Sequence, residues 1–198
     1  MAKVKICGLT REEDIREINL LKPDFAGFVF AKKSRRFLER KRAKELKNLL
    51  LPEIPSVGVF VNEDPEGIKA LIDEGIIDLI QLHGDEDEEY IRTLRHLTDK
   101  PIIRAFKVKT EEDLRKAEKS SADHILLDSG AGSGQVFDWS ILKKIHRPFF
   151  LAGGLSPENI REALDTLKPF GVDVSSGVES EGKKDPEKLK AFMEEVRK

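Results

Sequence analysis

One thiol and one carboxyl group stand at the ends of apolar segments of this chain. Cys7 is the only cysteine and ends the apolar run at residues 4–7, just before a glycine. Asp128 ends the run "HILLD". A thiolate can act as a base or a nucleophile, and a carboxyl group whose pKa is raised by burial can act as a general acid. The two residues are therefore candidates for a reaction that moves a proton.

Simpler interpretations exist for both side chains, and the sequence leaves them open. A lone cysteine can be a small buried apolar residue, and Asp128 can be an ion-paired or capping carboxylate. A helix beginning near Thr10 would direct its positive N-terminal end at the thiol and favour the thiolate. His83, in "LIQLHGDE", is the only histidine at the end of a predicted strand. It could be the base for a nucleophilic Cys7 or a core histidine, so both roles of Cys7 stay open.

Two segments rich in glycine and serine are typical of phosphate sites. They read "AGGLSPEN" and "VSSGVES", and each follows an apolar run. Small residues let backbone N–H groups and a helix N-terminus come close to a phosphate. Ordinary turns with a capping serine are the alternative. We expect these segments to bind the phosphate of a small-molecule substrate, through Gly153, Gly154, Ser175, Ser176 and Gly177.

A basic segment, "KKSRR" at residues 32–36, follows the second apolar run. A guanidinium can bind a carboxylate through two parallel hydrogen bonds, so Arg36 is a candidate for binding a carboxylate of the substrate. A solvated basic surface is the alternative. His83 is a further candidate for substrate binding. The chain has four histidines, with one at a strand end, which are too few for a typical catalytic zinc site, and we expect no metal.

The elements that must position these residues alternate regularly along the chain. Amphipathic helical segments separate eight apolar runs that are predicted as buried parallel strands, at residues 4–7, 25–30, 56–61, 79–82, 102–106, 124–127, 149–151 and 172–174. This alternation predicts an α/β protein, a (β/α)8 TIM barrel, formed by a single domain over residues 1–198. In that fold the polar residues that follow the strands meet at one end of the barrel. An open doubly wound sheet is the alternative, but the first turn lacks the pattern G-x-G-x-x-G.

Four helix starts carry explicit signals. Asp64, Ser156 and Asp185 each stand directly before a proline. This pattern predicts that each is an N-cap and that the proline is the first residue of the helix. "TREE" is predicted as a capping box, with Thr10 as the N-cap and Glu13 three residues later. The glycine-rich segment at residues 129–139, directly after Asp128, is expected to act as a lid over the site.

Composition excludes several classes of partner. The chain has 35 Lys and Arg against 37 Asp and Glu, and a net charge of −2 offers no field that would attract nucleic acid or an anionic membrane. Its apolar runs are far shorter than the ~18 residues of a membrane helix. One cysteine and no secretory signal predict a cytoplasmic protein. The 36% charged residues are typical of a thermophile, and the sequence is compatible with a monomer or a homodimer.

Seven motifs, in order along the whole chain, resemble the phosphoribosylanthranilate isomerase family of tryptophan biosynthesis. They are "KICGLT", "GFVF" with "KSRRF", "VGVFVNE", "IQLHGDE", "LLDSGAGSGQVFDW", "LAGGLSPENI" and "VDVSSGVE". The resemblance implies a cofactor-free Amadori rearrangement of N-(5′-phosphoribosyl)anthranilate to 1-(2-carboxyphenylamino)-1-deoxy-D-ribulose 5-phosphate. It further implies that Cys7 is the general base, that Asp128 is the general acid and that the glycine-rich loops hold the phosphate.

The carboxylate contact is less defined by this resemblance. The matching position is Arg36, which would bind the anthranilate carboxylate. Many relatives have the pattern P-x-S-x-R, whereas this chain has Ala31 and Lys32 before the serine, so Arg35 is an alternative. Two other functions stay open. The related phosphosugar isomerase of histidine biosynthesis has an aspartate where Cys7 stands, and a non-catalytic phosphate-binding barrel would not need both Cys7 and the acid.

Overall fold

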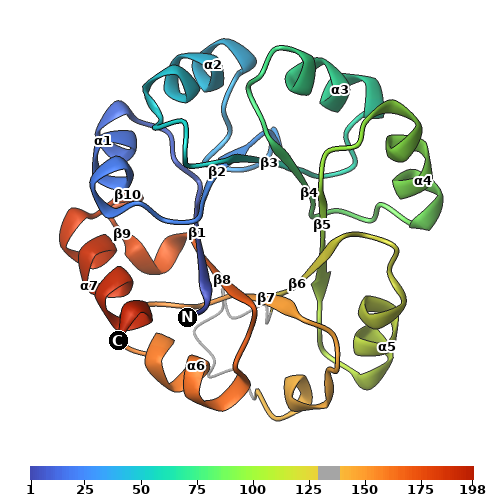
Figure 1. Cartoon of the computed structure of the whole chain (residues 1–198), viewed down its shortest axis with the longest axis vertical. Helices are drawn as coiled ribbons and strands as arrows, with labels where there is room; N and C mark the ends of the chain where they lie inside the picture. The colour runs from blue at the N-terminus through green and yellow to red at the C-terminus, as the bar shows by residue number, and fades with distance from the viewer. Residues whose placement is uncertain (129–138) are drawn as a thin grey trace.

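Eight parallel strands form a closed barrel in a computed structural model that describes residues 1–128 and 139–198 (Figure 1). The strands follow one another around the barrel in chain order, and β1 closes it by pairing in parallel with β8. The expected fold class is therefore confirmed, and strand ends differ from the predicted ones by no more than one residue. The bounds are β1 (Lys3–Cys7), β2 (Phe25–Val29), β3 (Ser56–Phe60), β4 (Leu79–Leu82), β5 (Ile102–Lys107), β6 (His124–Asp128), β7 (Phe149–Ala152) and β8 (Gly171–Val174).

Helices surround the barrel, as Figure 1 shows. Strands and α-helices alternate along the described residues except between β6 and β7. There the described residues contain only a 3-10 helix, η1 (Ile141–Lys144). After β8 come a second 3-10 helix, η2 (Ser176–Val178), and a short antiparallel pair, β9 (Glu179–Ser180) and β10 (Lys183–Lys184). The α-helices are α1 (Glu12–Leu21), α2 (Arg40–Leu49), α3 (Pro65–Asp73), α4 (Glu88–Leu97), α5 (Glu111–Lys119), α6 (Ile160–Leu167) and α7 (Pro186–Arg197).

Alternation along each strand decides which side chains enter the barrel. Successive strand residues point to opposite faces. Val4 and Ile6 of β1 therefore belong to the large core between the strands and the helices. Cys7 instead clusters with Val29 and Val59 from β2 and β3, inside the barrel. A separate apolar cluster, from five strands, fills the interior, and it consists of Val57, Leu79, Ile103, Ala105, Leu126, Phe150 and Ala152.

Two of the four predicted helix starts are confirmed. Asp64 and Asp185 are the N-caps of α3 and α7, and the carboxylate of Asp185 accepts hydrogen bonds from two backbone N–H groups of α7. The predictions at Thr10 and Ser156 are wrong. Helix α1 has its N-cap one residue after Thr10, and Asp14, not Glu13, completes its capping box. Ser156 begins a turn, and the N-cap of α6 is Asn159, which also accepts a hydrogen bond from the backbone of Ser156.

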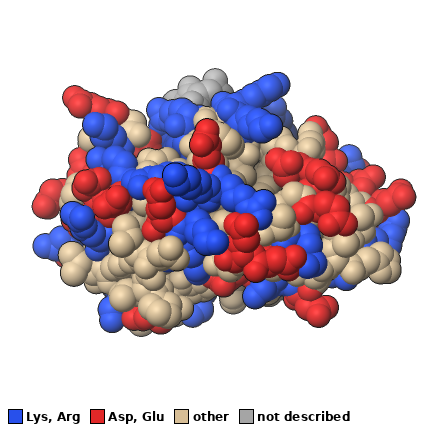
Figure 2. All heavy atoms as spheres, turned by 90° about the horizontal axis from the view of Figure 1, so that it is seen from above, with Lys and Arg blue, Asp and Glu red and all other residues tan. Residues whose placement is uncertain are grey.

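The charge-rich surface carries ion pairs between neighbouring helices, and the face in Figure 2 shows both signs interspersed. Arg42 of α2 contacts Glu12 of α1, for example, and Arg40 contacts Glu74 at the end of α3. This is the surface that the composition predicts. None of the helices in the described ranges is both long and apolar enough to cross a membrane.

Candidate active site

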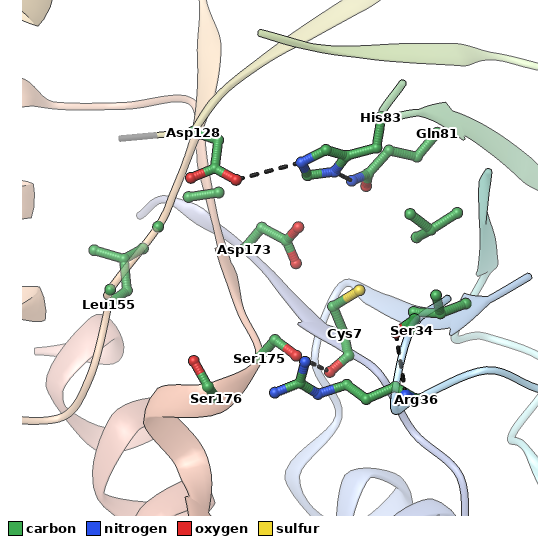
Figure 3. Close-up of a pocket in the computed structure, with 15 residues that line it drawn as sticks. Cys7, Ser34, Arg36, Gln81, His83, Asp128, Leu155, Asp173, Ser175 and Ser176 are labelled. Carbon is green, nitrogen blue, oxygen red and sulfur yellow. Dashed lines mark hydrogen bonds and ion pairs between the residues drawn. The ribbon is translucent and has the colours of Figure 1, made fainter. Parts of the chain in front are cut away.

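A pocket of about 410 Å³ opens at the C-terminal ends of the strands (Figure 3). Eight of the nine predicted site residues line it, so the barrel gathers side chains that are up to 169 positions apart in sequence, between Cys7 and Ser176. Cys7 and Asp128 reach the same pocket from β1 and β6. The eight are Cys7, Arg36, His83, Asp128, Gly153, Gly154, Ser175 and Ser176.

Cys7 lies above a buried ion pair that the sequence analysis did not identify. Lys5 precedes Cys7 by two residues and therefore points to the same side of β1, into the barrel. Its side chain is 0% exposed, and its ammonium donates hydrogen bonds of 2.9 and 3.0 Å to the two carboxylate oxygens of Asp173 on β8. Asp173 also lines the pocket. A charged pair thus forms part of the pocket floor beneath the thiol.

Burial raises the pKa of the Cys7 thiol above its ordinary value. The positive charge of Lys5 lowers this pKa, whereas the negative charge of Asp173 raises it. The effect of Lys5 is therefore too small to offset the effect of burial. Without a ligand, Cys7 is therefore a thiol at neutral pH. The sequence-based expectation of a thiolate stabilised by a helix end is not met, because the N–H groups of Thr10 and Arg11 already donate to the carboxylate of Asp14.

Asp128 is linked to a chain of hydrogen bonds across the opposite side of the pocket. Its Oδ2 lies 3.3 Å from Nε2 of His83, and Nδ1 of His83 lies 3.1 Å from Nε2 of Gln81. Figure 3 shows these three side chains in a row, reaching from β6 to β4. The carboxyl group is thus placed beside an imidazole that can form a hydrogen bond with it, in a row that ends at the amide of Gln81.

Arg36 is held over the pocket by a buried carboxylate, Glu179. Nε and Nη2 of Arg36 donate to the two oxygens of Glu179 at 2.6 and 2.8 Å. Arg35 also donates to Glu179, but its side chain is 60% exposed against 19% for Arg36, and only Arg36 lines the pocket. Nη1 of Arg36 has no partner among the described residues. Of the two arginines, Arg36 is therefore the one that the structure brings to the pocket.

Lys184 completes this cluster. Its ammonium donates to Glu179 at 2.8 Å and to the carbonyl oxygen of Ser175 at 2.9 Å. Burial alone would raise the pKa of Glu179, but the bonds from Arg36 and Lys184 outweigh it and hold this pKa below its ordinary value. Glu179 is therefore ionised at neutral pH. The cations around it outnumber its single negative charge, so the cluster can accept an anionic ligand.

Two glycines make room for the reactive side chains. Gly8 has φ +80°, a region that disfavours other residues, and a Cβ there would lie 2.2 Å from Cδ of Arg36. A Cβ on Gly27 of β2 would lie 2.8 Å from the sulfur of Cys7. Arg36 can cross the end of β1, and Cys7 can face the pocket, because both positions lack a side chain.

The two glycine-rich loops lie side by side at the end of β7 and β8. Gly153 and Gly154 have positive φ values, 91° and 65°, and both line the pocket. The hydroxyl of Ser175 donates to the carbonyl oxygen of Cys7 at 3.0 Å, which ties the second loop to β1. Gly177 is the predicted site residue that the structure does not bring to the pocket lining. A Cβ on it would lie 1.8 Å from the carbonyl oxygen of Leu155, so it lets the two loops pack together.

The predicted lid falls almost entirely on residues 129–138, which lie outside the described residues. In the described part of the chain, no cluster of three or more histidine, cysteine or carboxylate side chains could hold a metal ion.

Several functional residues were missed from the sequence, although a signal existed for three of them. Lys5, Gln81 and Asp173 each interrupt an apolar strand, in "VKIC", "LIQL" and "VDV". Polar residues at inward positions of a strand require partners, so these interruptions mark a polar layer inside the barrel. Glu179 follows β8 by five residues and carried no comparable signal.

Replacement of Asp173 with asparagine would release the charge of Lys5 to act on Cys7. We expect the pKa of Cys7 to fall and its alkylation by iodoacetamide at pH 7.5 to become about tenfold faster, which corresponds to one pKa unit. Mass spectrometry would follow the labelling of this single cysteine. Lys5→Met is the matched control and should slow the alkylation. Equal or slower labelling of Asp173→Asn, with the fold intact by circular dichroism, would contradict the proposed balance of charges.

Replacement of Glu179 with alanine would leave Arg36 and Lys184 without the anion between them. Removing one partner of a buried ion pair costs about 3–5 kcal/mol, and we expect the free energy of unfolding in urea to fall by this amount. Glu194→Ala is the control, because Glu194 lies exposed on α7. The cluster is not needed for stability if both variants unfold at the same urea concentration.

The family model for N-(5′-phosphoribosyl)anthranilate isomerase matches residues 4–195. The N-(5′-phosphoribosyl)anthranilate isomerase of Acetivibrio thermocellus is 46% identical, over 100% of this chain and 96% of that protein. The crystal structure of monomers generated from the dimeric enzyme of Thermotoga maritima is 38% identical and has a TM-score of 0.88, over 100% of this chain and 99% of that one. A phosphoribosyl anthranilate isomerase in complex with reduced 1-(o-carboxyphenylamino)-1-deoxyribulose 5-phosphate is also 38% identical, with the same coverage and a TM-score of 0.87. On this evidence the chain belongs to the N-(5′-phosphoribosyl)anthranilate isomerase family.

Proposed function

We propose that this protein isomerises N-(5′-phosphoribosyl)anthranilate in tryptophan biosynthesis, with Asp128 as the general acid and Cys7 as the general base. The observation that carries this proposal is that the two side chains reach one pocket from β6 and β1, between two glycine-rich loops and a fixed arginine. The product is 1-(2-carboxyphenylamino)-1-deoxy-D-ribulose 5-phosphate. The reaction moves a proton within the substrate and involves no cofactor in this proposal.

Asp128 begins the reaction by protonating the ring oxygen of the furanose. The bond between C1′ and this oxygen breaks, its electron pair stays with the oxygen as a hydroxyl group, and the nitrogen lone pair forms an iminium ion with C1′. Asp128 is left as a carboxylate, to which the Nε2–H of His83 can donate a hydrogen bond. A donor aimed at the charge that develops on an acid stabilises the transition state.

The thiolate form of Cys7 then removes the proton from C2′ and becomes the thiol. The iminium ion makes this proton acidic because the electron pair of the C–H bond can move into the C=N⁺ bond. The product of this step is an enolamine, which tautomerises to the ketone. In this proposal the acid on β6 and the base on β1 lie on opposite sides of the ligand, and each carries out one of the two proton transfers.

Binding groups at the two ends of the pocket would orient the reacting carbons. In this proposal the backbones of Gly153 and Gly154 and the hydroxyl of Ser176 bind the phosphate, and Nη1 of Arg36 binds the anthranilate carboxylate; all four residues line the pocket. Val29 and Val59 give the aromatic ring an apolar surface beside Cys7. Binding energy from groups that do not react can thus hold the sugar in a reactive geometry. We also propose that the single barrel domain, residues 1–198, acts as a monomer or homodimer in the cytoplasm.

Removing the sulfur or the acid should abolish turnover without abolishing binding. We expect Cys7→Ala and Asp128→Asn to lower kcat by at least about 10³-fold, in line with the loss of a positioned acid or base. Loss of the fluorescence of phosphoribosylanthranilate, generated in situ, gives the rate. The affinity for the reduced product analogue should change little in either variant. A Cys7→Ala enzyme with a near-normal rate would remove the thiol from the mechanism.

The pH dependence should show the raised pKa of Cys7. Only the thiolate accepts a proton, and burial raises the pKa of this thiol above its ordinary value, so the fraction of active base increases as the pH rises through the alkaline range. We expect the rate of iodoacetamide labelling of the free enzyme to increase from pH 7 to pH 9 by about tenfold per pH unit below this pKa. The value of kcat/KM should increase less steeply, because the first step requires a protonated acid as well as a thiolate base. Labelling at pH 7 that is faster than that of glutathione would show a depressed pKa and disprove this assignment.

A further inference from the structure

Gln81 is a buried amide in the pocket that the proposed reaction does not use. Its neighbours on β4, Ile80 and Leu82, point outward into the core beneath the helices, so Gln81 points into the barrel, where it lines the pocket. It is 1% exposed. Its Nε2 faces His83, and its Oε1 is fully buried with no hydrogen-bond partner in the described residues.

The amide nitrogen of Gln81 fixes the tautomer of His83. An amide NH₂ group can only donate, so Nδ1 of His83 must accept and carry no proton. The proton of the neutral imidazole is then on Nε2, which lies 3.3 Å from Oδ2 of Asp128 and donates to it. Gln81 therefore acts on the acid through His83.

The amide oxygen of Gln81 lacks the donor that a buried acceptor requires. Buried polar atoms in folded proteins are almost always hydrogen-bonded, and an exception marks a functional atom or a missing ligand. The buried ammonium of Lys5 is no partner for this oxygen, because its hydrogen bonds go to the two oxygens of Asp173. Because Gln81 lines the pocket, a ligand in the pocket can supply the missing N–H or O–H group.

We propose that Gln81 both positions the acid, through His83, and accepts a hydrogen bond from the substrate. This inference rests on the proposed function, which supplies a substrate with two kinds of donor near the reacting carbons, the anilino N–H and the sugar hydroxyls. The N–H becomes more acidic as the nitrogen turns into an iminium ion. An acceptor for it therefore stabilises the transition state more than the ground state.

Gln81→Met tests the proposal with a side chain of similar size that neither donates nor accepts. We expect kcat/KM for phosphoribosylanthranilate to fall about 10- to 100-fold, the range for the loss of one directed polar group. The midpoint of thermal unfolding should stay equal to that of the wild type or rise, because the variant no longer buries an unpaired oxygen. Lower activity at undiminished stability separates this role from a merely structural one.

The two parts of the proposal can be measured separately. Imidazole ¹⁵N shifts, with His83 assigned by its loss in His83→Asn, should show the Nε2–H tautomer in the wild type and a mixture of tautomers in Gln81→Met. In the His83→Asn background, Gln81→Met removes only the contact with the substrate. A further loss in kcat there identifies the anilino N–H as the donor, and a loss confined to affinity for the reduced product analogue identifies a hydroxyl.

Two results would overturn the inference. One is an Nδ1–H tautomer of His83 in the wild type, which requires the opposite amide orientation and leaves Gln81 with no free acceptor. The other is a Gln81→Met enzyme with unchanged kcat/KM and unchanged affinity for the analogue. Failure of the proposed function is distinguishable from both, because the wild type itself would then not consume phosphoribosylanthranilate.

Discussion

Burial of charge at the mouth of a closed barrel is the constraint on which the rest of the site depends. An ammonium group cannot be buried without a partner, and the complete burial of Lys5 is possible because β1 and β8 pair with Lys5 opposite Asp173. Closure of the barrel creates this pairing. Cys7 is the next residue along β1 that points into the barrel. Burial raises the pKa of its thiol, and the charges of Lys5 and Asp173 change this pKa in opposite directions. The fold thus sets the chemistry of the thiol before any ligand binds.

Buried charges also need partners at the end of the pocket that is proposed to bind the substrate carboxylate. Arg36 and Lys184 come from opposite ends of the chain, and Glu179 holds them together while it is itself almost completely buried. Through the bond from Lys184 to Ser175, the cluster also reaches the second glycine-rich loop. The groups proposed to bind the carboxylate and the phosphate are therefore parts of one network. A change in Glu179 affects the positions of both.

Sequence reasoning predicted the barrel and its eight strands, and eight of its nine predicted site residues line the pocket, because apolar runs and strand ends are local features. Gly177 has the right composition for a phosphate loop, but contact with Leu155 from the neighbouring loop decides its place. Of the interpretations of Cys7 that the sequence left open, the thiolate favoured by a helix end finds no support in the structure. The helix end that should have favoured a thiolate is occupied by Asp14, and burial depends on β2 and β3. Long-range contacts thus decide the place of Gly177 and the burial of Cys7, whereas the bonds of Asp14 are local and belong to the capping box of α1.

The two sides of the pocket differ in a way that matches the order of the proposed steps. The acid side holds Asp128 in a row of hydrogen bonds with an imidazole and an amide. The base side holds a thiol that burial keeps protonated in the free enzyme. Ring opening creates a positive nitrogen in the pocket, and its attraction for the thiolate at short range is strong where water is excluded. In the proposed mechanism the acid step therefore generates the charge that favours the thiolate, so that proton removal from C2′ follows ring opening and does not precede it.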